Sequence, residues 1–517
     1  MNSNKPFRYT STSSSGLRQL SKNTEELLRR AVHRKTMKTL DTTKNNKTRK
    51  HIPSLSGRVS KLQPSYQPHN SNNKRTRYSI KRHPDYLEQL VSTYYDNDES
   101  AHKYLATAHR RMHILPPARR IIVIGDIHGD FDAAIKCLIL AGCIAPCNIP
   151  EDKTVENMDV FFKSLVWTGG DTQVVQLGDQ IDRVRPSRWD RNSISQTEAH
   201  EDEGSTLEIF FLFWYLNRLA QQEQLEPGAV HCIIGNHEIM NVEGNFSYVS
   251  SAEFKSFKEH LAHVYPPNSK YPYHSRTLKN TRETRKSRGL PVGYRERLYA
   301  FSPTGLCSNF MARNYYTMLQ IGNWLFCHGS PTLATLGTYE IDLINTITSM
   351  YLLGLDTQPA ATTQPTTTNQ QIGQTDNQLA NKIEWHFDNI MNDDTTSRLS
   401  TSIIWSRTFG FPELSSPSTT TKTTVSNLCA LLDKILATYN SKNNNTSPYN
   451  TATHIAIGHT AQIDGNQQLG INSICNGRVW RCDVGMSKAF TKRNTNKNAR
   501  KIQVLEIINN KPRVITY

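Results

Sequence analysis

Short runs of β-branched and aliphatic residues recur along the middle of the chain, and each run ends in glycine or in a polar residue. Runs of this length and composition predict buried strands. Five core strands are expected: Ile121–Ile124, Val174–Leu177, Val230–Ile234, Trp324–Cys327 and His454–Ile457. Three more are expected toward the C-terminal end: Gly477–Cys482, Ile502–Ile507 and Pro512–Ile515.

Helical periodicity occupies the intervals between these strands. Strands that alternate with helices predict an α/β fold with a largely buried sheet, and the last three strands indicate a second sheet packed on the first. Four helices are expected: Asp132–Ala141, Leu207–Ala220, Leu333–Leu353 and one opened by Pro84 that carries Leu87, Leu90, Val91 and Tyr94 on one face.

The segments outside this pattern set the expected domain organisation. Residues 1–82 are rich in Ser, Thr, Asn, Lys and Arg and show no sustained period, so they cannot bury enough apolar area to offset the entropy of ordering. We therefore expect a disordered basic tail at 1–82, a helical lead-in at 83–117 and a catalytic domain at 118–517. Polar, low-complexity stretches predict insertions in that domain near 186–204, 269–297, 356–380 and 411–448.

Charge is concentrated in the tail. Residues 1–82 hold 20 Lys and Arg but only three acidic residues, out of 61 basic and 45 acidic residues in the chain, so the remainder is nearly neutral. Two interpretations of the tail stay open: docking on nucleic acid or another acidic surface, or a solvated spacer. The cluster at Arg282, Arg285, Lys286 and Arg288 is likewise either a rim that steers substrate or a surface loop.

The cellular compartment can be inferred from the lengths of the apolar runs and from the cysteines. No run approaches the ~20 apolar residues that span a bilayer, and the first residues lack the apolar core of a secretory signal. The nine cysteines show no zinc-site or disulfide-framework spacing. We expect buried, reduced thiols in an intracellular protein, cytoplasmic or, because of the basic tail, nuclear.

A potential metal ligand follows each of the five core strands. In chain order these are Asp126 with His128, then Asp179, Asn236, His328 and His459. Because side chains alternate along an extended chain, Asp126 and His128 are expected to point the same way. Two carboxylates, three imidazoles and an amide oxygen are donors that suit a site for Mn, Fe or Zn better than they suit a structural zinc site. Asp179, central in the series, is the natural bridge between two cations that would clamp the attacking and leaving oxygens of an in-line displacement.

The neighbours of these ligands suggest roles in phosphate chemistry. Arg183 can form a two-pronged contact with phosphate oxygens. His237 is expected to protonate the leaving oxygen, and Asp182 is the carboxylate expected to orient it. The expected nucleophile is a metal-bridging water, and Glu238 is expected to support the site without binding metal.

Five motifs in this order resemble the phosphoprotein phosphatase family of the calcineurin-like metallophosphoesterases. They are GDIHG (125–129), GDQIDR (178–183), GNHE (235–238), the His328 in CHGS and GHT (458–460). The segments IIWSRTFG (403–410) and GRVWRCDVGMSKAF (477–490) resemble the bacterial-like, or Shewanella-like, branch. The resemblance implies the metallophosphoesterase fold: a central β-sandwich flanked by helices, with a two-metal site at the strand ends.

The resemblance also implies roles for individual residues. One metal would be held by Asp126, His128 and Asp179, and the other by Asp179, Asn236, His328 and His459. The proton-donor pair would be His237 with Asp182, and phosphate would be contacted by Arg183, Arg407 and Asn236. A surface or salt-bridged arginine in a Trp-containing strand is the alternative interpretation of Arg407. Val184 replaces the glycine usual after the motif arginine, which we expect to reshape the loop around Arg183.

The leading hypothesis is a metal-dependent phosphomonoesterase that uses manganese and a metal-bridging hydroxide. It is most simply a protein phosphatase, with phosphoserine and phosphothreonine as the first candidates and phosphotyrosine as the second. Its expected partner is a phosphoprotein or phosphopeptide. One alternative is a hydrolase of dinucleoside polyphosphates or other small phosphoesters. Another is a basic nucleic-acid-binding protein whose phosphatase body is inactive.

Overall fold

The computed structural model describes residues 85–95, 112–185, 202–222, 227–265, 290–355, 383–391, 401–411, 425–443, 451–463, 470–490 and 501–517. The tail expected at 1–82, the cluster from Arg282 to Arg288 and most of the expected insertions lie outside these residues. The chain divides into two units after Pro84. The helices and strands of the described residues all belong to the second unit, Asp85–Tyr517.

Four parallel strands form one side of the first sheet, out to one of its edges. Their order is β2 (Arg120–Ile124), β3 (Gln173–Gln176), β4 (Ala229–Ile233) and β5 (Tyr315–Tyr316). Beyond β2 the sheet continues with two antiparallel strands, β11 (Gln503–Ile508) and β12 (Lys511–Thr516). The apolar residues of β2, β3 and β4 are buried, as continuous apolar runs predict for strands covered on both faces.

The second sheet also has six strands. Their spatial order is β1 (Ile114–Leu115), β6 (Met318–Ile321), β7 (Trp324–Cys327), β8 (His454–Ile457), β10 (Val479–Arg481) and β9 (Asn472–Ile474). The expected α/β fold with a second sheet is therefore confirmed, but its expected membership is wrong. The strands β11 and β12 extend the first sheet, and β7 and β8 lie in the second with β10. Two sheets flanked by helices are the arrangement that the resemblance implies, a central β-sandwich. The unexpected strands β1, β5, β6 and β9 are only two to four residues long, too short for a clear periodic signal.

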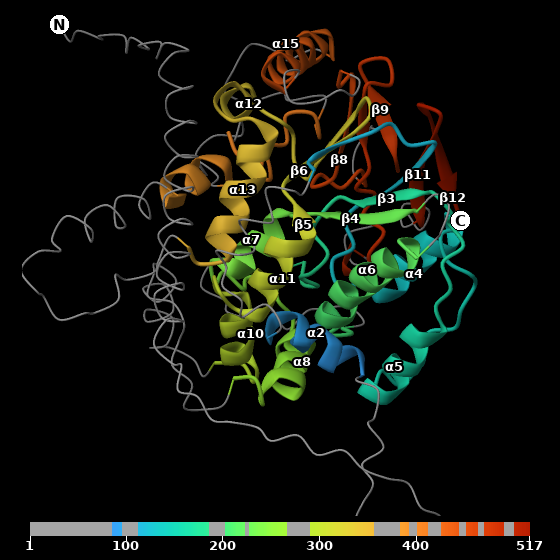
Figure 1. The fold of residues 1–517 in the computed structure, drawn as a ribbon, viewed down its shortest axis with the longest axis vertical. Coiled ribbons are helices and arrows are strands. Elements are labelled where there is room, and N and C mark those ends of the chain that lie inside the picture. Colours follow the sequence, from blue (N-terminus) through green and yellow to red (C-terminus); the bar gives the residue numbers. More distant parts are fainter. Residues whose placement is uncertain are drawn as a thin grey trace, which may run out of the picture. The chain divides into compact units, whose positions relative to one another are not determined.

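Helices cover the sheets (Figure 1). In the first sheet α6 (Thr206–Ala220) packs on β4, and α4 (Phe131–Leu140) contacts α6 and β11. The expected helix Leu333–Leu353 is wrong as a single element, because it divides into α12 (Leu333–Thr338) and α13 (Ile341–Leu352). The extended backbone of Tyr339 interrupts the helix between them. The Tyr339 side chain is buried, and its hydroxyl hydrogen-bonds the His386 ring.

Several helices lie where none was expected. The helix α2 (Tyr86–Tyr95) was expected; α5 (Val155–Ser164), α7 (Asn236–Val242), α8 (Ser251–Leu261), α10 (Tyr294–Phe301), α11 (Leu306–Asn314) and α15 (Val425–Asn443) were not. The range of α15 lies inside the stretch 411–448 that was expected to be an insertion, yet Leu428, Leu432 and Ile435 are buried at helical spacing. No helix of the described ranges is long and apolar enough to cross a membrane.

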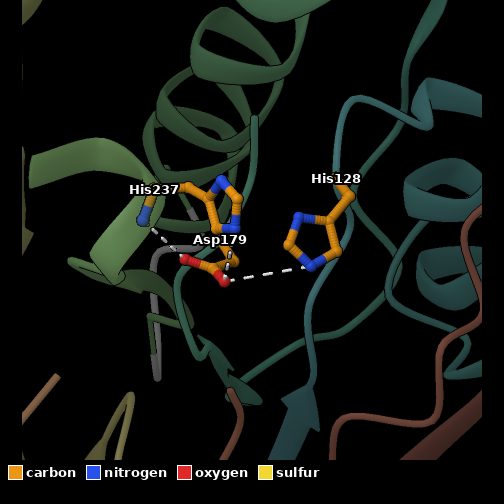
Figure 2. Close-up of side chains that lie close together, drawn as sticks. All are labelled: His128, Asp179 and His237. Carbon is orange, nitrogen blue, oxygen red and sulfur yellow. Dashed lines mark hydrogen bonds and ion pairs between the residues drawn. The ribbon is translucent and has the colours of Figure 1, made fainter. Parts of the chain in front are cut away.

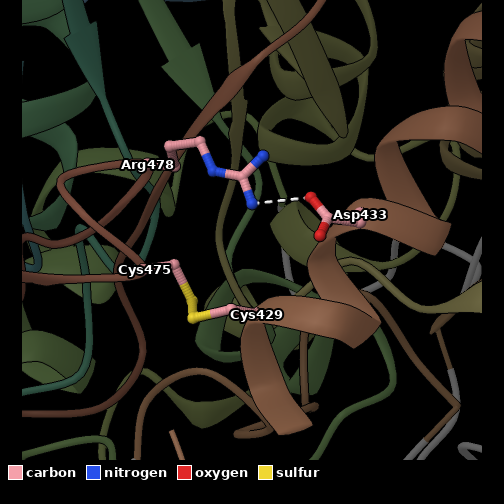
Figure 3. The surroundings of a disulfide bond; sticks show 4 residues. All are labelled: Cys429, Asp433, Cys475 and Arg478. Atoms are coloured by element: carbon pink, nitrogen blue, oxygen red, sulfur yellow. Dashed lines mark hydrogen bonds and ion pairs between the residues drawn. A yellow bond between two sulfur atoms is a disulfide. The ribbon is translucent and has the colours of Figure 1, made fainter. Parts of the chain in front are cut away.

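The cysteine expectation is wrong for two residues. Cys429 of α15 and Cys475, which lies between β9 and β10, form a disulfide with Cα atoms 5.3 Å apart (Figure 3). Arg478 and Asp433 form an ion pair of 2.6 Å between the same two segments. The sulfurs are 46 residues apart in sequence, so only the packing of α15 against the strand pair brings them together. Six other cysteines are buried free thiols: Cys137, Cys143, Cys232, Cys307, Cys327 and Cys482.

Candidate active site

The ends of strands from both sheets bring the expected ligands together. Asp126 and His128 follow β2, Asp179 follows β3, Asn236 begins α7 just after β4, His328 follows β7 and His459 follows β8. All six side chains are buried. Because the carboxyl ends of parallel strands meet at one edge of a sheet, residues far apart in sequence meet here.

The first group of potential ligands surrounds one oxygen of Asp179. The rings of His128 and His237 both face this carboxylate (Figure 2). The Nε2 atoms of both histidines are 3.8 Å from Asp179 Oδ2, and His128 Nε2 is also 3.8 Å from Asp126 Oδ2. These separations exceed hydrogen-bond lengths but fit donors that share a cation at ~2.0–2.2 Å. The donor set and its spacing therefore fit a divalent metal.

The second group surrounds the other oxygen of Asp179. Ligand atoms of Asp179, His328 and His459 all lie within 4.8 Å of one another. His328 Nε2 is 3.2 Å from Asp179 Oδ1 and 2.9 Å from Asn236 Oδ1. Asp179 thus faces one imidazole group with each oxygen, which is the arrangement that a bridging carboxylate requires.

Backbone carbonyls orient two of the rings. The Nδ1 atom of His328 lies 2.8 Å from the Leu177 carbonyl oxygen, and that of His128 lies 3.3 Å from the Ile181 carbonyl oxygen. These contacts leave Nε2 of both rings facing Asp179. Carbonyl support of this kind is what fixes the tautomer of a metal-binding histidine.

Tight turns, and not extended chain, aim the side chains. His128, Asp179 and His459 have φ of 47°, 49° and 66°, in the left-handed region that non-glycine residues rarely adopt. The N–H groups of Ile127 and His128 both donate to the Asp179 carbonyl oxygen, at 3.0 and 2.9 Å. Asp126 and His128 do converge, but the reason expected from strand alternation is wrong, since a hydrogen-bonded turn brings them together.

Two motif glycines make room for the carboxylates. A Cβ atom on Gly458 would lie 2.3 Å from Asp126 Oδ1, and one on Gly235 would lie 2.3 Å from Asp179 Oδ1. Any larger residue would displace the carboxylate that the site is built around. This close approach explains the glycine that opens both the GNHE and GHT motifs.

The electrostatics of the site also fit a cation. Burial, together with the charges of Asp483 and Asp179, raises the pKa of Asp126 well above its usual range. Burial alone would raise the pKa of Asp179 too, but the imidazoles of His328 and His237 outweigh it and hold that pKa well below its usual range. Divalent cations would relieve this crowding of buried carboxylates.

Two of the imidazoles are held in the form that binds metal. Burial lowers the pKa of His128, with help from the charge of Arg185, and burial lowers the pKa of His459, with help from the charge of Arg407. A neutral imidazole keeps a lone pair for a metal ion.

A buried polar chain stands behind His237. Its Nδ1 lies 2.8 Å from Asp182 Oδ2, and Asn241 Nδ2 donates to both Asp182 oxygens, at 2.9 and 3.0 Å. Arg297 Nη2 donates to Asp182 Oδ1 at 3.2 Å and Arg297 Nε to Asn241 Oδ1 at 2.8 Å. The expected pairing of Asp182 with His237 is thus present in the structure.

Two buried glutamates hold the loop after β3 in place. Glu238 Oε2 accepts the N–H groups of Asp179 and Gly235 at 2.9 and 2.8 Å, which matches the supporting role expected for it. Glu253 accepts the N–H groups of Asp182 and Arg183 at 3.1 and 3.0 Å. The turn that presents Asp179 is therefore fixed by side chains from α7 and α8.

The two expected phosphate arginines differ in their surroundings. Arg407 Nη1 donates to the His459 carbonyl oxygen at 2.7 Å and to Thr460 Oγ1 at 3.3 Å, and no described carboxylate lies within ion-pair distance of it. The salt-bridged alternative for Arg407 is thus not seen among described residues. Arg183 forms ion pairs instead, with its guanidinium 3.6 Å from Asp130 Oδ2 and 3.9 Å from Glu203 Oε1.

Sequence reasoning missed several residues around the site. Asp483 comes two residues after the end of β10, so its position as a carboxylate at a strand end was open to inference. Asn241 is one helical turn beyond His237, so its position was also open to inference. Arg297 had no such signal, because it lies at the edge of a basic stretch that was expected to be an insertion.

Comparison with known families agrees with this geometry. The model of the calcineurin-like phosphoesterase family matches residues 119–342, which include β2 to β7 and the residues from Asp126 to His328. The fold, the strand-end ligands and this match over residues 119–342 together indicate the class: a hydrolase of the calcineurin-like phosphoesterase type. Members of this family depend on two metal ions.

Curated relatives and solved structures are similar to this chain at low identity. Shewanella-like protein phosphatase 2 of Arabidopsis thaliana is 25% identical over 381 residues, 71% of this chain and 72% of that protein. Uncharacterized protein R398 of Acanthamoeba polyphaga mimivirus is 26% identical over 304 residues, 56% of this chain and 92% of that protein. The structure of a cold-active protein-tyrosine phosphatase of a psychrophilic Shewanella species has a TM-score of 0.40 at 16% identity, covering 78% of this chain and 82% of that chain.

Proposed function

We propose that this chain is a two-metal phosphomonoesterase that acts on phosphoproteins. The observation that carries the proposal is the position of Asp179, whose two oxygens face two separate groups of buried imidazoles. The similarity to an Arabidopsis protein named as a protein phosphatase supports phosphoproteins as the substrate class.

The residues that would hold the metals are those at the strand ends. Asp126, His128 and Asp179 would hold one ion, and Asp179, Asn236, His328 and His459 the other, with manganese as the first candidate from the mixed oxygen and imidazole donors. When bound, two such ions supply Lewis acidity that polarises a phosphate and promotes ionisation of water. The remaining chemistry falls to the protein's own side chains.

His237 is proposed as the proton donor. Its Nδ1 is engaged by Asp182, so its Nε2 is the nitrogen that faces the site, 3.8 Å from Asp179 Oδ2. Asp182 is itself fixed by Asn241 and Arg297, so the ring cannot turn without breaking a buried network. A ring held in this way can deliver a proton from Nε2 to the oxygen of the departing alcohol.

Phosphate binding is proposed for Arg407 and Asn236. Both lie beside a histidine of the second group: Arg407 bonds the carbonyl oxygen of His459, and the Asn236 side-chain oxygen approaches His328. The hydrogen bonds of Arg407 use Nη1, and no described carboxylate neutralises its charge. A guanidinium in this state is suited to a phosphate dianion.

The experiment compares substrates on manganese-loaded protein. Peptides with phosphoserine, phosphothreonine and phosphotyrosine are assayed beside diadenosine tetraphosphate, with Asp126→Asn as the ligand-deficient control. The proposal expects phosphopeptide hydrolysis that Asp126→Asn abolishes together with bound manganese. Preferred turnover of diadenosine tetraphosphate would support the small-phosphoester alternative instead. Salt-sensitive nucleic-acid binding without any hydrolysis would support the binding-protein alternative.

A further inference from the structure

Arg185, two residues beyond the motif arginine Arg183, extends into the site. Its guanidinium lies 5.5 Å from the centre of the Tyr248 ring and 5.0 Å from that of Phe490. The Tyr248 ring is 4.7 Å from the His237 ring, and the Phe490 ring is 5.5 Å from the His128 ring. The arginine head is therefore held between two aromatic rings that contact the histidines facing Asp179.

The guanidinium of Arg185 keeps donors for a ligand. Its Nη1 donates to the carbonyl oxygens of Asp182 and Val184 at 3.0 and 2.8 Å. Its Nε and Nη2 have no acceptor among the residues that the structure describes, and no described carboxylate lies within ion-pair distance. A partly buried cation with open donors and no counter-ion is suited to an anionic ligand.

Arg185 and Arg407 share their electrostatic neighbours. Burial lowers the pKa of both guanidinium groups, and for both the charges of Asp179, Asp483 and Tyr248 act in the opposite direction. The two arginines thus approach the same buried carboxylates from different parts of the chain, the loop after β3 and the segment 401–411.

Arg183 is committed elsewhere. It is 1% exposed, and its guanidinium pairs with Asp130 and Glu203. Asp130 is fixed in turn, because one oxygen caps α4 and the other accepts the Lys488 N–H at 2.7 Å. Turning Arg183 toward the metal ligands would leave the buried Asp130 without this cation, a substantial cost for a buried carboxylate.

We infer that Arg185, and not Arg183, contacts the phosphate of the substrate together with Arg407. This assignment rests on the proposed function. Tyr248 and Phe490 are the positioning residues, since their rings contact both the guanidinium and the histidines. The Val184 that replaces the usual glycine fits this assignment: its N–H donates to the Tyr248 carbonyl oxygen at 2.9 Å, which ties the loop beneath the arginine to the segment that carries the ring.

The test measures binding of inorganic phosphate by titration calorimetry on manganese-loaded protein, alongside kcat, KM, metal content and Tm. Arg185→Gln removes a charge-assisted contact and is expected to weaken phosphate binding by about 10- to 100-fold with metal content retained. Arg185→Lys should restore only part of this, because an ammonium lacks the planar fork. Arg218→Gln is the matched control: Arg218 also lies over an aromatic ring, Trp214 at 4.9 Å, but is exposed on α6, and phosphate binding should not change.

Three further variants separate contact from structural support. Arg183→Gln should lower Tm more than Arg185→Gln does, and should weaken phosphate binding less. Tyr248→Leu should weaken phosphate binding while Tyr248→Phe, which keeps the ring, restores it. If the folded, metal-loaded Arg185→Gln protein kept the wild-type phosphate affinity and Arg183→Gln lost it, the assignment of Arg185 would be overturned while the proposed function would stand. Absence of phosphate binding and hydrolysis in the wild-type protein would overturn both the assignment and the proposed function.

Discussion

The Nδ1 atom of His237 lies 2.8 Å from Oδ2 of Asp182, and both side chains are buried. The partners come from different elements, because His237 is in the first turn of α7 and Asp182 is in the loop after β3. Because Asp182 engages Nδ1, Nε2 is the nitrogen of the His237 ring that faces the potential metal ligands.

Replacement of His237 should slow hydrolysis in a manner that depends on the leaving group. For His237→Asn we expect kcat for a phosphoserine peptide to fall by about 10²- to 10⁴-fold, because the alcohol then leaves without a positioned proton. The loss should be smaller for p-nitrophenyl phosphate, whose leaving group needs no protonation. His260→Asn on α8 is the control for a histidine outside the site. An equal loss on both substrates would count against the proton-donor role.

Arg297 should matter for stability as well as for activity. It is fully buried and is the cation beside Asp182, so Arg297→Met leaves an uncompensated buried carboxylate. We expect the free energy of unfolding to fall by about 3–5 kcal/mol, measured by urea denaturation. The neighbouring Arg295→Gln, at a partly exposed position, should cost about 1 kcal/mol or less. Similar losses in the two variants would mean that the buried network is not what Arg297 stabilises.

Metal removal should destabilise the folded protein. Chelation leaves Asp126, Asp179 and Asp483 crowded without a cation, so Tm should fall and manganese should restore it. A ligand present at 100 times its Kd contributes about 2.7 kcal/mol to stability. Asp179→Asn should bind less manganese than wild type by elemental analysis, because both ions would share this residue. An unchanged metal content in Asp179→Asn would contradict the bridging assignment.

Glu506 should make stability depend on pH at the acid end. Burial alone would raise the pKa of this carboxyl on β11, but hydrogen bonds from Arg120 of β2 and Arg513 of β12 outweigh it and hold the pKa below its usual value. The ionised Glu506 carboxylate therefore contributes to the free energy of unfolding above its pKa in the unfolded chain, about 4.3. This contribution is lost as pH falls through its lower pKa in the folded protein. The Tm difference between wild type and Glu506→Gln should be steady near pH 7 and shrink in acid. A difference that grows in acid would refute this.

The disulfide should stabilise the packing of α15. The bond between Cys429 and Cys475 closes a loop with a sequence separation of 46, and Cys429→Ser is expected to lower the free energy of unfolding by about 2–4 kcal/mol. Dithiothreitol should lower the Tm of the wild type to about that of Cys429→Ser, and it should leave the Tm of Cys429→Ser unchanged. Cys147→Ser, at a partly exposed free cysteine, is the control. A wild-type Tm that does not respond to the reductant would show that the bond is absent in solution.

Local sequence patterns are enough to identify the potential metal ligands. Asp126, Asp179 and His459 each follow a short apolar strand and a glycine, and these features depend only on neighbouring residues. The α/β class follows from the same runs. The helix α15 could have been predicted too, because its apolar residues keep helical spacing within a polar stretch.

The sequence by itself therefore determined the class of fold and the chemical types gathered at the strand ends, since strand periodicity and strand-end glycines are local properties. Only the tertiary structure decided which side chains meet across long separations. It turned Arg183 toward Asp130, held Arg185 between Tyr248 and Phe490, and brought Arg297 to Asp182. The physical reason is that the direction of a long, flexible arginine side chain is fixed by the buried charges and rings packed around it, which come from distant parts of the chain.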